Sequence, residues 1–259
     1  MRVLVCVKRV PAPGARINIT PDGGDVDTAV LGFTTSPHEE CAVEAAVQLL
    51  DDREGNATVL TLGTELAEEQ LRYAASVGMT AAVLVRRDDD SPDWDPQRTA
   101  RAISRAIEQL EADDGPFDLI VFGNESADAG GFQVGVRVGH ALGRPMVNAV
   151  KGIEMAADAE TVIARRETDA GNEVYELPLP ACVGVKEGIN LPRYPTMKGR
   201  LASKKIEITT IEAQGEPGGS ARVRLESPAE MVADTVVLGT GPDAAGAVVD
   251  VLDELGVLT

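Results

Sequence analysis

Four short runs of almost uninterrupted apolar residues lie in the first half of the chain, separated by segments in which Ala, Val and Leu recur at helical spacing. Such runs are typical of parallel strands covered on both faces, and their alternation with helices indicates βαβ units. The sequence therefore predicts an α/β fold with a parallel sheet and flanking helices. The expected strands are 2–7, 57–62, 81–86 and 118–123, and the expected helices are 37–50, 66–77 and 97–110.

The pattern changes after about residue 148, where apolar and polar positions alternate in short runs. Alternation of this kind is typical of antiparallel strands with one solvent-exposed face, and turn residues at 169–172 separate two of the runs. Residues 181–185 return to the composition of a buried strand. We expect an antiparallel hairpin extension built from 150–155, 161–167 and 173–178.

The remaining segments are less regular. Residues 12–35 are rich in Gly, Asp and Thr, which predicts a loop or hairpin excursion, and 206–211 alternates like an exposed strand. The end of the chain is loop-like up to a short amphipathic helix at 244–255. Because such a tail is weakly anchored by itself, we predict an α/β domain over 1–211 and a C-terminal arm over 212–259 that contacts a partner.

Acidic residues outnumber basic ones, with 42 Asp and Glu against 24 Lys and Arg and a formal net charge of −18. This excess argues against a nucleic-acid-binding protein, which needs a basic face to neutralise phosphates, and against a basic amphipathic protein of the membrane surface. Only six of the basic residues are Lys. Abundant carboxylates with few Lys suit a protein kept dissolved in concentrated salt, where repulsion is screened, so we expect a halophilic host.

The motifs of common catalytic and metal sites are missing from the sequence. It has two His and lacks HExxH, CxxC, GxSxG, Walker A and calcium-loop patterns. We therefore expect no metal site and no catalytic residue, and a chain that binds a ligand or uses the chemistry of a cofactor. The Cys residues are expected to be buried and reduced, and no apolar run reaches about 18 residues, so we expect a cytoplasmic protein without membrane insertion.

The first candidate site is the stretch 123–135, which follows an expected strand and leads into a helix expected to end near Leu142. Small residues at 126–131 let the backbone approach a ligand closely, and a helix start offers free N–H groups that suit a phosphate. Open α/β sheets bind ligands just beyond the carboxyl ends of their strands. Because the spacing is not GxGxxG, the residues alone leave two interpretations open, a nucleotide site and an ordinary strand–helix loop.

The second candidate is the docking segment, our name for residues 186–205. It carries six basic residues and one acidic residue, Glu187, within a strongly acidic chain, and it holds four of the six Lys. A local charge that opposes the global one favours a docking or anion-facing loop over a merely solvated loop. The basic residues are Lys186, Arg193, Lys198, Arg200, Lys204 and Lys205.

Several stretches together resemble the beta subunit of electron transfer flavoproteins, the FixA/EtfB family. They are VKRVP at 7–11, SPHEECAVEAA at 36–46, RRETDAG at 165–171 followed by LPAC at 179–182, and NLPRYPTMKGRLASKK at 190–205. The last string is long and specific to the family. The resemblance covers nearly the whole chain.

The resemblance implies a Rossmann-like α/β domain in a heterodimer with a larger alpha subunit. The alpha subunit would hold most of a redox FAD at the shared interface, and this chain would bury an AMP, or a second FAD as in electron-bifurcating relatives. The implied role is to shuttle electrons from acyl-CoA dehydrogenases or other flavin dehydrogenases to the respiratory chain, as in fatty acid oxidation. No bond-making chemistry is implied for this chain.

The resemblance also implies which residues meet the nucleotide. Ser36 and His38 stand where the family usually has Asn and Phe, and Gly130 and Gly131 lack the polar groups of bifurcating relatives, which favours AMP. The stretch 123–134 is called the nucleotide loop below. The implied nucleotide contacts are Cys6, Ser36, Pro37, His38, Glu39, Leu62, Gly123, Asn124, Glu125, Ser126, Ala127, Asp128, Ala129, Gly130, Gly131, Phe132, Gln133 and Val134.

In the docking segment, Met197 aligns with the apolar residue by which the family anchors on partner dehydrogenases. An unbranched Met can fill pockets of varied shape, and the nearby Lys198, Arg200 and Arg193 would orient an acidic partner. A stand-alone adenine-nucleotide-binding module is an alternative, but it would need neither this segment nor the arm. An adenylating enzyme would need an SGGxDS loop after the first strand, where this chain has KRVP at 8–11.

Overall fold

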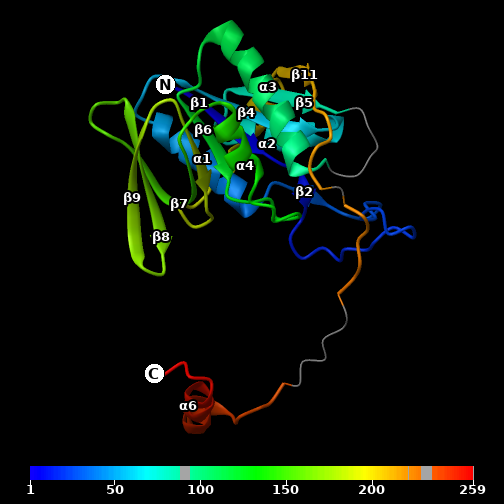
Figure 1. The fold of residues 1–259 in the computed structure, drawn as a ribbon, viewed down its shortest axis with the longest axis vertical. Coiled ribbons are helices and arrows are strands. Elements are labelled where there is room, and N and C mark those ends of the chain that lie inside the picture. The colour runs from blue at the N-terminus through cyan, green and yellow to red at the C-terminus, as the bar shows by residue number, and fades with distance from the viewer. Residues whose placement is uncertain (88–93, 221, 229–234, 259) are drawn as a thin grey trace. The chain divides into compact units, whose positions relative to one another are not determined.

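The computed structural model describes residues 1–87, 94–220, 222–228 and 235–258, and it divides the chain into two units, Met1–Leu225 and Glu226–Thr259. Nine strands of the described residues form one sheet in the first unit (Figure 1). In order across the sheet they are β11 (Ile208–Glu212), β5 (Ala81–Arg86), β4 (Asn56–Gly63), β1 (Arg2–Val7), β6 (Leu119–Gly123), β10 (Ala181–Val185), β7 (Met146–Met155), β8 (Thr161–Thr168) and β9 (Gly171–Pro178).

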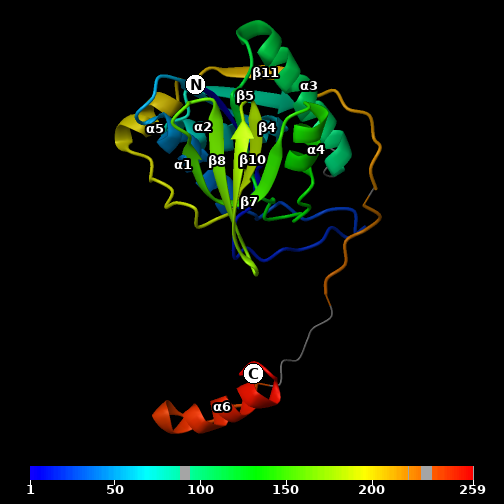
Figure 2. The ribbon, with the colours of Figure 1, turned by 60° about the vertical axis from the view of Figure 1, so that its left-hand side comes forward.

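Helices cover both faces of the sheet (Figure 2). One face carries α1 (Pro37–Leu50) and α2 (Glu68–Ser76), which follows a 3-10 turn, η1 (Glu65–Ala67). The other face carries α3 (Pro96–Asp114) and α4 (Val134–Ala141). A short helix, α5 (Met197–Ser203), packs against α2. This arrangement confirms the predicted α/β fold.

Strand β1 shows why the strands were recognisable from the sequence. Its Val3 and Val5 pack in the apolar cluster that includes α1 and α2, whereas Leu4 and Cys6 pack in the cluster that includes α3. Because successive side chains of a strand point to opposite faces, a strand between two helical layers must be apolar at every position. The strands expected at 2–7 and 81–86 are found at those bounds.

Strands β11 to β7 pair in parallel, whereas β7 with β8 and β8 with β9 pair antiparallel. The antiparallel strands extend from one side of the sheet, which confirms the predicted hairpin extension (Figure 1). Strand β7 begins at Met146 rather than at 150, because its first residues lie beside β10 in the main sheet before the strand continues into the hairpin.

Two segments of the second half differ from the prediction. Residues 206–211 were expected as an exposed strand, but β11 pairs in parallel with β5 and buries Ile211 at the edge of the main sheet. Most β11 side chains other than Ile211 are exposed, so the sequence pattern of this edge strand is the same as that of an exposed strand. The docking segment contains α5, which is too short for helical periodicity to be recognised in the sequence.

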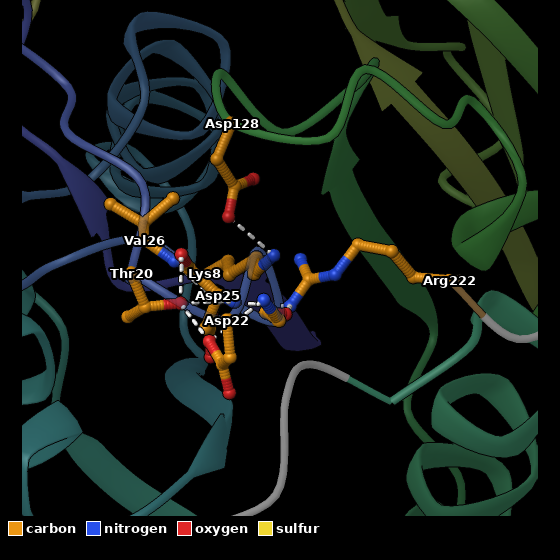
Figure 3. Close-up of polar contacts among 8 residues, drawn as sticks. Lys8, Thr20, Asp22, Asp25, Val26, Asp128 and Arg222 are labelled. Carbon is orange, nitrogen blue, oxygen red and sulfur yellow. Dashed lines mark hydrogen bonds and ion pairs between the residues drawn. The ribbon is translucent and has the colours of Figure 1, made fainter. Parts of the chain in front are cut away.

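The excursion at 12–35 begins and ends in a small antiparallel pair, β2 (Val10–Pro11) and β3 (Phe33–Thr34). Its central turn binds residues from the far end of the first unit (Figure 3). Arg222 donates from Nη2 to Asp25 Oδ1 at 3.0 Å, and the Leu225 N–H donates to a carbonyl of the same turn at 2.9 Å. Arg222 and Leu225 therefore contact the excursion, and the first unit ends at Leu225, whereas the domain boundary at 211 stays a prediction.

The second unit contains a 3-10 turn, η2 (Gly241–Ala244), and α6 (Ala245–Glu254), where a helix was predicted at 244–255. No residue of these two elements is buried in the described part of the chain. Val248, Val249 and Leu255 expose large apolar side chains on this helix and at its end. Among the described residues, no helix has the length and apolar character needed to cross a membrane.

Candidate functional site

The sheet changes direction at β1, and this creates a place for a ligand. The chain leaves β1 through α1 to reach β4 on one side, and it returns from β5 through α3 to reach β6 on the other side. The helices after β1 and before β6 therefore lie on opposite faces, and open α/β sheets bind ligands beyond the carboxyl ends of the strands at such a switch point. The region beyond the ends of β1 and β6 is called the crevice below. The predicted contacts at Cys6, Ser36 and Gly123 come from these ends and from the start of α1.

The start of α1 lies directly against the end of β6. A Cβ atom added to Gly123 would be 2.6 Å from Glu39 Cγ, 3.2 Å from the Glu39 backbone nitrogen and 3.3 Å from His38 Cβ. These distances are too short for any side chain larger than hydrogen. Glycine at 123 therefore allows the first turn of α1 to reach the crevice.

Glu39 is a buried carboxyl group at the floor of this crevice. It is 6% exposed, and it accepts hydrogen bonds from the backbone N–H of Ser36, at 3.2 Å, and from the backbone N–H of Lys8. Burial raises the pKa of Glu39 to about 8, against the opposing effect of these hydrogen bonds. The crevice floor is therefore neutral at pH 7, which reduces the repulsion that a phosphate would meet there.

The raised pKa of Glu39 predicts a pH-dependent contribution to stability. Because the pKa in the folded protein lies above the ordinary value of 4.5, this contribution is fully present below pH 4.5 and is lost as the pH rises toward 8. Glu39→Gln resembles the neutral form of Glu39. Its free energy of unfolding, relative to that of wild type, should therefore increase by roughly 3 kcal/mol between pH 5 and pH 8. Denaturant titrations at both pH values measure this difference.

The matched control for this measurement is Glu176→Gln, which removes one negative charge from an exposed position on β9. Its stability relative to wild type is expected to stay nearly constant between the two pH values. An equal gain for both variants would show that the effect comes from net charge and not from the buried position of Glu39.

Some predicted contacts use their side chains to hold the fold. The Asn124 side chain accepts a hydrogen bond at Oδ1 from the Ala149 N–H at 2.9 Å, and the Asn124 N–H donates to the Val185 carbonyl at 2.8 Å. The Cys6 thiol is buried in the core, and burial, followed by the nearby Cys182 and Glu39, raises its pKa well above the ordinary value. The side chain of Cys6 belongs to the apolar cluster that includes α3, and that of Leu62 packs against this cluster.

The nucleotide loop crosses the open side of the crevice. Gly130 and Phe132 both have positive φ, at 53° and 54°, so the loop turns sharply just before α4. The side chains at 127–130 are small or exposed. A Cβ atom added to Gly131 would find its nearest neighbour, Pro96 Cγ, only at 4.0 Å. The loop therefore leaves space for a ligand at the first turn of α4, where backbone N–H groups lack intrahelical acceptors.

Lys8 closes the crevice from the β1 side. Its Nζ donates to Asp128 Oδ2 at 2.6 Å, which joins the end of β1 to the nucleotide loop (Figure 3). Lys8 was not predicted to lie in the site. Its position directly after β1, at the same sheet edge as Gly123, is the signal that could have placed it there.

His38 connects three parts of the chain at this edge. Its Nδ1 accepts a hydrogen bond from the Glu187 N–H at 2.8 Å, and its Nε2 lies 3.4 Å from Glu125 Oε1. The start of α1, the nucleotide loop and the beginning of the docking segment therefore meet at one side chain.

The docking segment presents apolar side chains to solvent. Met197 is 75% exposed at the start of α5, and Leu191 and Tyr194 are each 89% exposed. The backbone below them is held in place, because Arg72 donates from Nη1 to the carbonyls of Ser203 and Lys204, each at 3.3 Å. A fixed backbone that carries exposed apolar side chains is suited to docking.

The basic residues of the docking segment fall into two groups. Lys198 and Arg200 are exposed beside Met197. Arg193 is partly exposed but binds carboxylates at α1 and its end: its Nε donates to Glu44 at 2.8 Å and its Nη2 lies 3.2 Å from Asp51. Glu44 is 4% exposed; burial raises its pKa, but the hydrogen bonds from Arg193 outweigh this and leave the pKa lowered. Arg193 therefore anchors the segment on α1.

Comparison with known proteins shows the family to which the chain belongs. Residues 26–216 match the electron transfer flavoprotein domain family. The chain is 33% identical over 214 residues to the electron transfer flavoprotein subunit beta of Syntrophomonas wolfei, covering 82% of this chain and 80% of that protein. This chain belongs to the electron transfer flavoprotein beta-subunit family. The beta subunit of Megasphaera elsdenii is 32% identical, covering 87% of this chain and 83% of that protein. The beta subunit of Bacillus subtilis is 30% identical, covering 82% of this chain and 79% of that protein.

Membership of the electron transfer flavoprotein beta-subunit family gives the chain a role in electron transport as one subunit of a flavoprotein. The site has no group of three or more His, Cys, Asp or Glu residues arranged to hold a metal ion, within the ranges that the structure describes. In this beta subunit the crevice residues supply backbone groups, the Lys8–Asp128 ion pair, the His38–Glu125 pair and the buried carboxyl group of Glu39.

Proposed function

We propose that this chain, as the beta subunit of a heterodimeric electron transfer flavoprotein, binds an AMP in the crevice between β1 and β6. Together with an alpha subunit it shapes an FAD site at their interface. The complex shuttles electrons from flavin dehydrogenases, such as the acyl-CoA dehydrogenases of fatty acid oxidation, to the respiratory chain. The observation that carries the nucleotide proposal is the contact of Gly123 with the start of α1 at the switch point of the sheet.

The residues of the crevice fit a phosphate-bearing adenine nucleotide. The first turn of α4 offers backbone N–H groups to an anion, and the Lys8 ammonium lies at the same edge. Glu39 opposes an anion only weakly while it is protonated. When bound, AMP supplies no redox chemistry, and the chain's task is to hold it through backbone contacts and to keep water out.

The alternative is a second FAD in place of AMP, as in an electron-bifurcating complex. Gly130 and Gly131 offer no side-chain donors to an isoalloxazine ring, and this supports AMP. The number of FAD molecules per heterodimer distinguishes between AMP and a second FAD in the crevice. The purified heterodimer is expected to contain one FAD per complex by absorbance after denaturation, and two FAD per complex would establish the alternative.

The docking segment supports the proposed partner class. An acidic dehydrogenase surface with an apolar pocket would match exposed Met197 next to exposed Lys198 and Arg200. The acidity of the rest of the surface would keep such a partner from binding elsewhere. Partners from the halophilic host that we expect would share this acidic surface.

Met197→Ala is expected to lower kcat/KM for electron transfer from a partner flavin dehydrogenase by about tenfold, because a buried anchor contributes roughly 1–2 kcal/mol to docking. The FAD content of the complex should not change, since Met197 lies on a solvent-exposed helix. Val174→Ala, which truncates an exposed apolar side chain on β9, is the matched control and should transfer electrons at the wild-type rate. An unchanged rate in Met197→Ala would remove Met197 from the docking surface.

A further inference from the structure

His38 lies between the two functional regions of the chain. It is the second residue of α1, and its side chain is 12% exposed. Its two ring nitrogens face different regions: Nδ1 accepts from the Glu187 N–H at 2.8 Å, and Nε2 is 3.4 Å from the Glu125 carboxylate. Glu125 belongs to the nucleotide loop, whereas Glu187 is the second residue of the docking segment.

These contacts determine where the imidazole proton lies. An Nδ1 that accepts a hydrogen bond carries no proton, so a neutral His38 carries its proton on Nε2, directed at Glu125. One ring therefore donates toward the nucleotide loop and accepts from the docking segment. Phenylalanine, which has no ring nitrogen, could make neither contact.

The backbone of Glu187 is held from two sides. Its N–H donates to His38, and its carbonyl accepts from Lys151 Nζ at 2.6 Å. The next residue, Gly188, has a φ of 82°, so the chain turns there. The direction in which the docking segment leaves the sheet is therefore set at Glu187, immediately next to His38.

We propose that His38 is a positioning residue that couples the nucleotide loop to the docking segment. A nucleotide in the crevice fixes the nucleotide loop and with it Glu125. Glu125 then orients the His38 ring, and the ring holds the Glu187 amide at the start of the docking segment. The coupling rests on the proposed function, because it requires a nucleotide in the crevice. The hydrogen bond between His38 and the Glu187 amide is present without the nucleotide, and a bound nucleotide would make it longer-lived.

Three substitutions separate the two contacts. His38→Asn places its side-chain oxygen near the position of Nδ1, so it keeps an acceptor for Glu187 and loses the contact with Glu125. His38→Gln places its amide near the position of Nε2, so it keeps a donor for Glu125 and loses the acceptor for Glu187. His38→Phe loses both. His140→Asn is the matched control, because His140 is the other His of the chain and is exposed on α4.

The experiment is hydrogen–deuterium exchange of the heterodimer, dialysed free of nucleotide and then measured with and without added AMP. Without AMP, the peptide containing Glu187 is expected to exchange roughly tenfold faster in His38→Phe and His38→Gln than in wild type, because its amide loses its acceptor. His38→Asn and His140→Asn should exchange at the wild-type rate. The melting temperature of each variant verifies that it folds.

Added AMP tests the coupling. In wild type and in His140→Asn, AMP is expected to slow exchange both in the nucleotide loop and at Glu187. In His38→Asn and His38→Phe it should slow exchange in the nucleotide loop alone. A wild-type protein in which AMP protects the loop but not Glu187 would overturn the coupling and leave the proposed function intact.

Two other results would also overturn the proposal. His38→Phe with the wild-type exchange rate at Glu187 would show that the ring does not fix this amide. Wild-type protein in which AMP protects neither region would overturn the proposed AMP site, and the coupling with it.

Discussion

Gly123→Val is expected to abolish AMP retention by the heterodimer and to destabilise the first unit. A Cβ atom at this position would lie 2.6 Å from Glu39 Cγ and 3.2 Å from the Glu39 backbone nitrogen, so the start of α1 must move away from β6. Overpacking of this kind costs about 1–3 kcal/mol, and the displaced helix start would no longer line the crevice. Denaturant unfolding measures the first effect, and nucleotide extraction from the purified complex measures the second.

The matched control for Gly123→Val is Gly246→Ala in α6, where an added Cβ atom has no neighbour within 4 Å. This variant should retain AMP and unfold as wild type does. If Gly123→Val retained a full complement of AMP, the crevice between β1 and β6 would not be the nucleotide site. If it lost AMP without loss of stability, the contact with α1 would matter for binding but not for the fold.

Deleting residues 226–259 is expected to weaken heterodimer formation by at least about 100-fold and to leave the melting temperature of the first unit unchanged. The expectation follows from the proposal that this unit binds the alpha subunit. No residue of η2 or α6 is buried in the described part of the chain, and both elements belong to the unit that is separate from Met1–Leu225. An exposed apolar helix face is favourable when a partner covers it. Burying two Val or Leu side chains contributes about 3–6 kcal/mol to binding, before the entropic cost of ordering the helix is subtracted.

A single substitution tests whether the apolar face of α6, and not simply the presence of residues 226–259, is needed for heterodimer formation. Val249→Asp places a charge on the exposed apolar surface of α6 and should weaken the heterodimer, whereas Asp250→Asn changes a neighbouring exposed residue and should not. Analytical ultracentrifugation with the alpha subunit measures both. A heterodimer of wild-type affinity after the deletion would assign the interface to the first unit alone.

The main strands could be predicted because each is apolar at nearly every position. β1 and β5 lie between two helical layers, and all of their interior positions are buried. β11 could not be placed in the same way, because an edge strand in a parallel sheet alternates as a solvent-exposed strand does. α5 could not be predicted, because its position depends on packing against α2 rather than on its own seven residues.

The general position of the candidate site could be predicted, because the sequence places small residues and a helix start just after β6. The family resemblance also assigns the start of α1 to the site. What the sequence could not show is which side chains meet across the crevice. Lys8 and Asp128 are 120 positions apart, and His38 and Glu187 are 149 apart. Such pairs are set by the order of the strands, and neither residue of a pair carries a local pattern that points to the other.

The roles of single residues in the docking segment could not be predicted from the sequence either. Its positive charge could be read from the sequence, but Arg193 binds Glu44 and Asp51 on α1, whereas Lys198 and Arg200 remain exposed. Charge alone does not distinguish an anchoring Arg from a docking Lys. The halophilic host inferred from the net charge of −18 stays a prediction.

We propose that the crevice between β1 and β6 holds one AMP. To test this, the native heterodimer is denatured and the released nucleotides are identified and quantified by chromatography and mass spectrometry. Wild-type protein is expected to release one AMP and one FAD for each heterodimer. Release of FAD without any AMP would contradict the proposal.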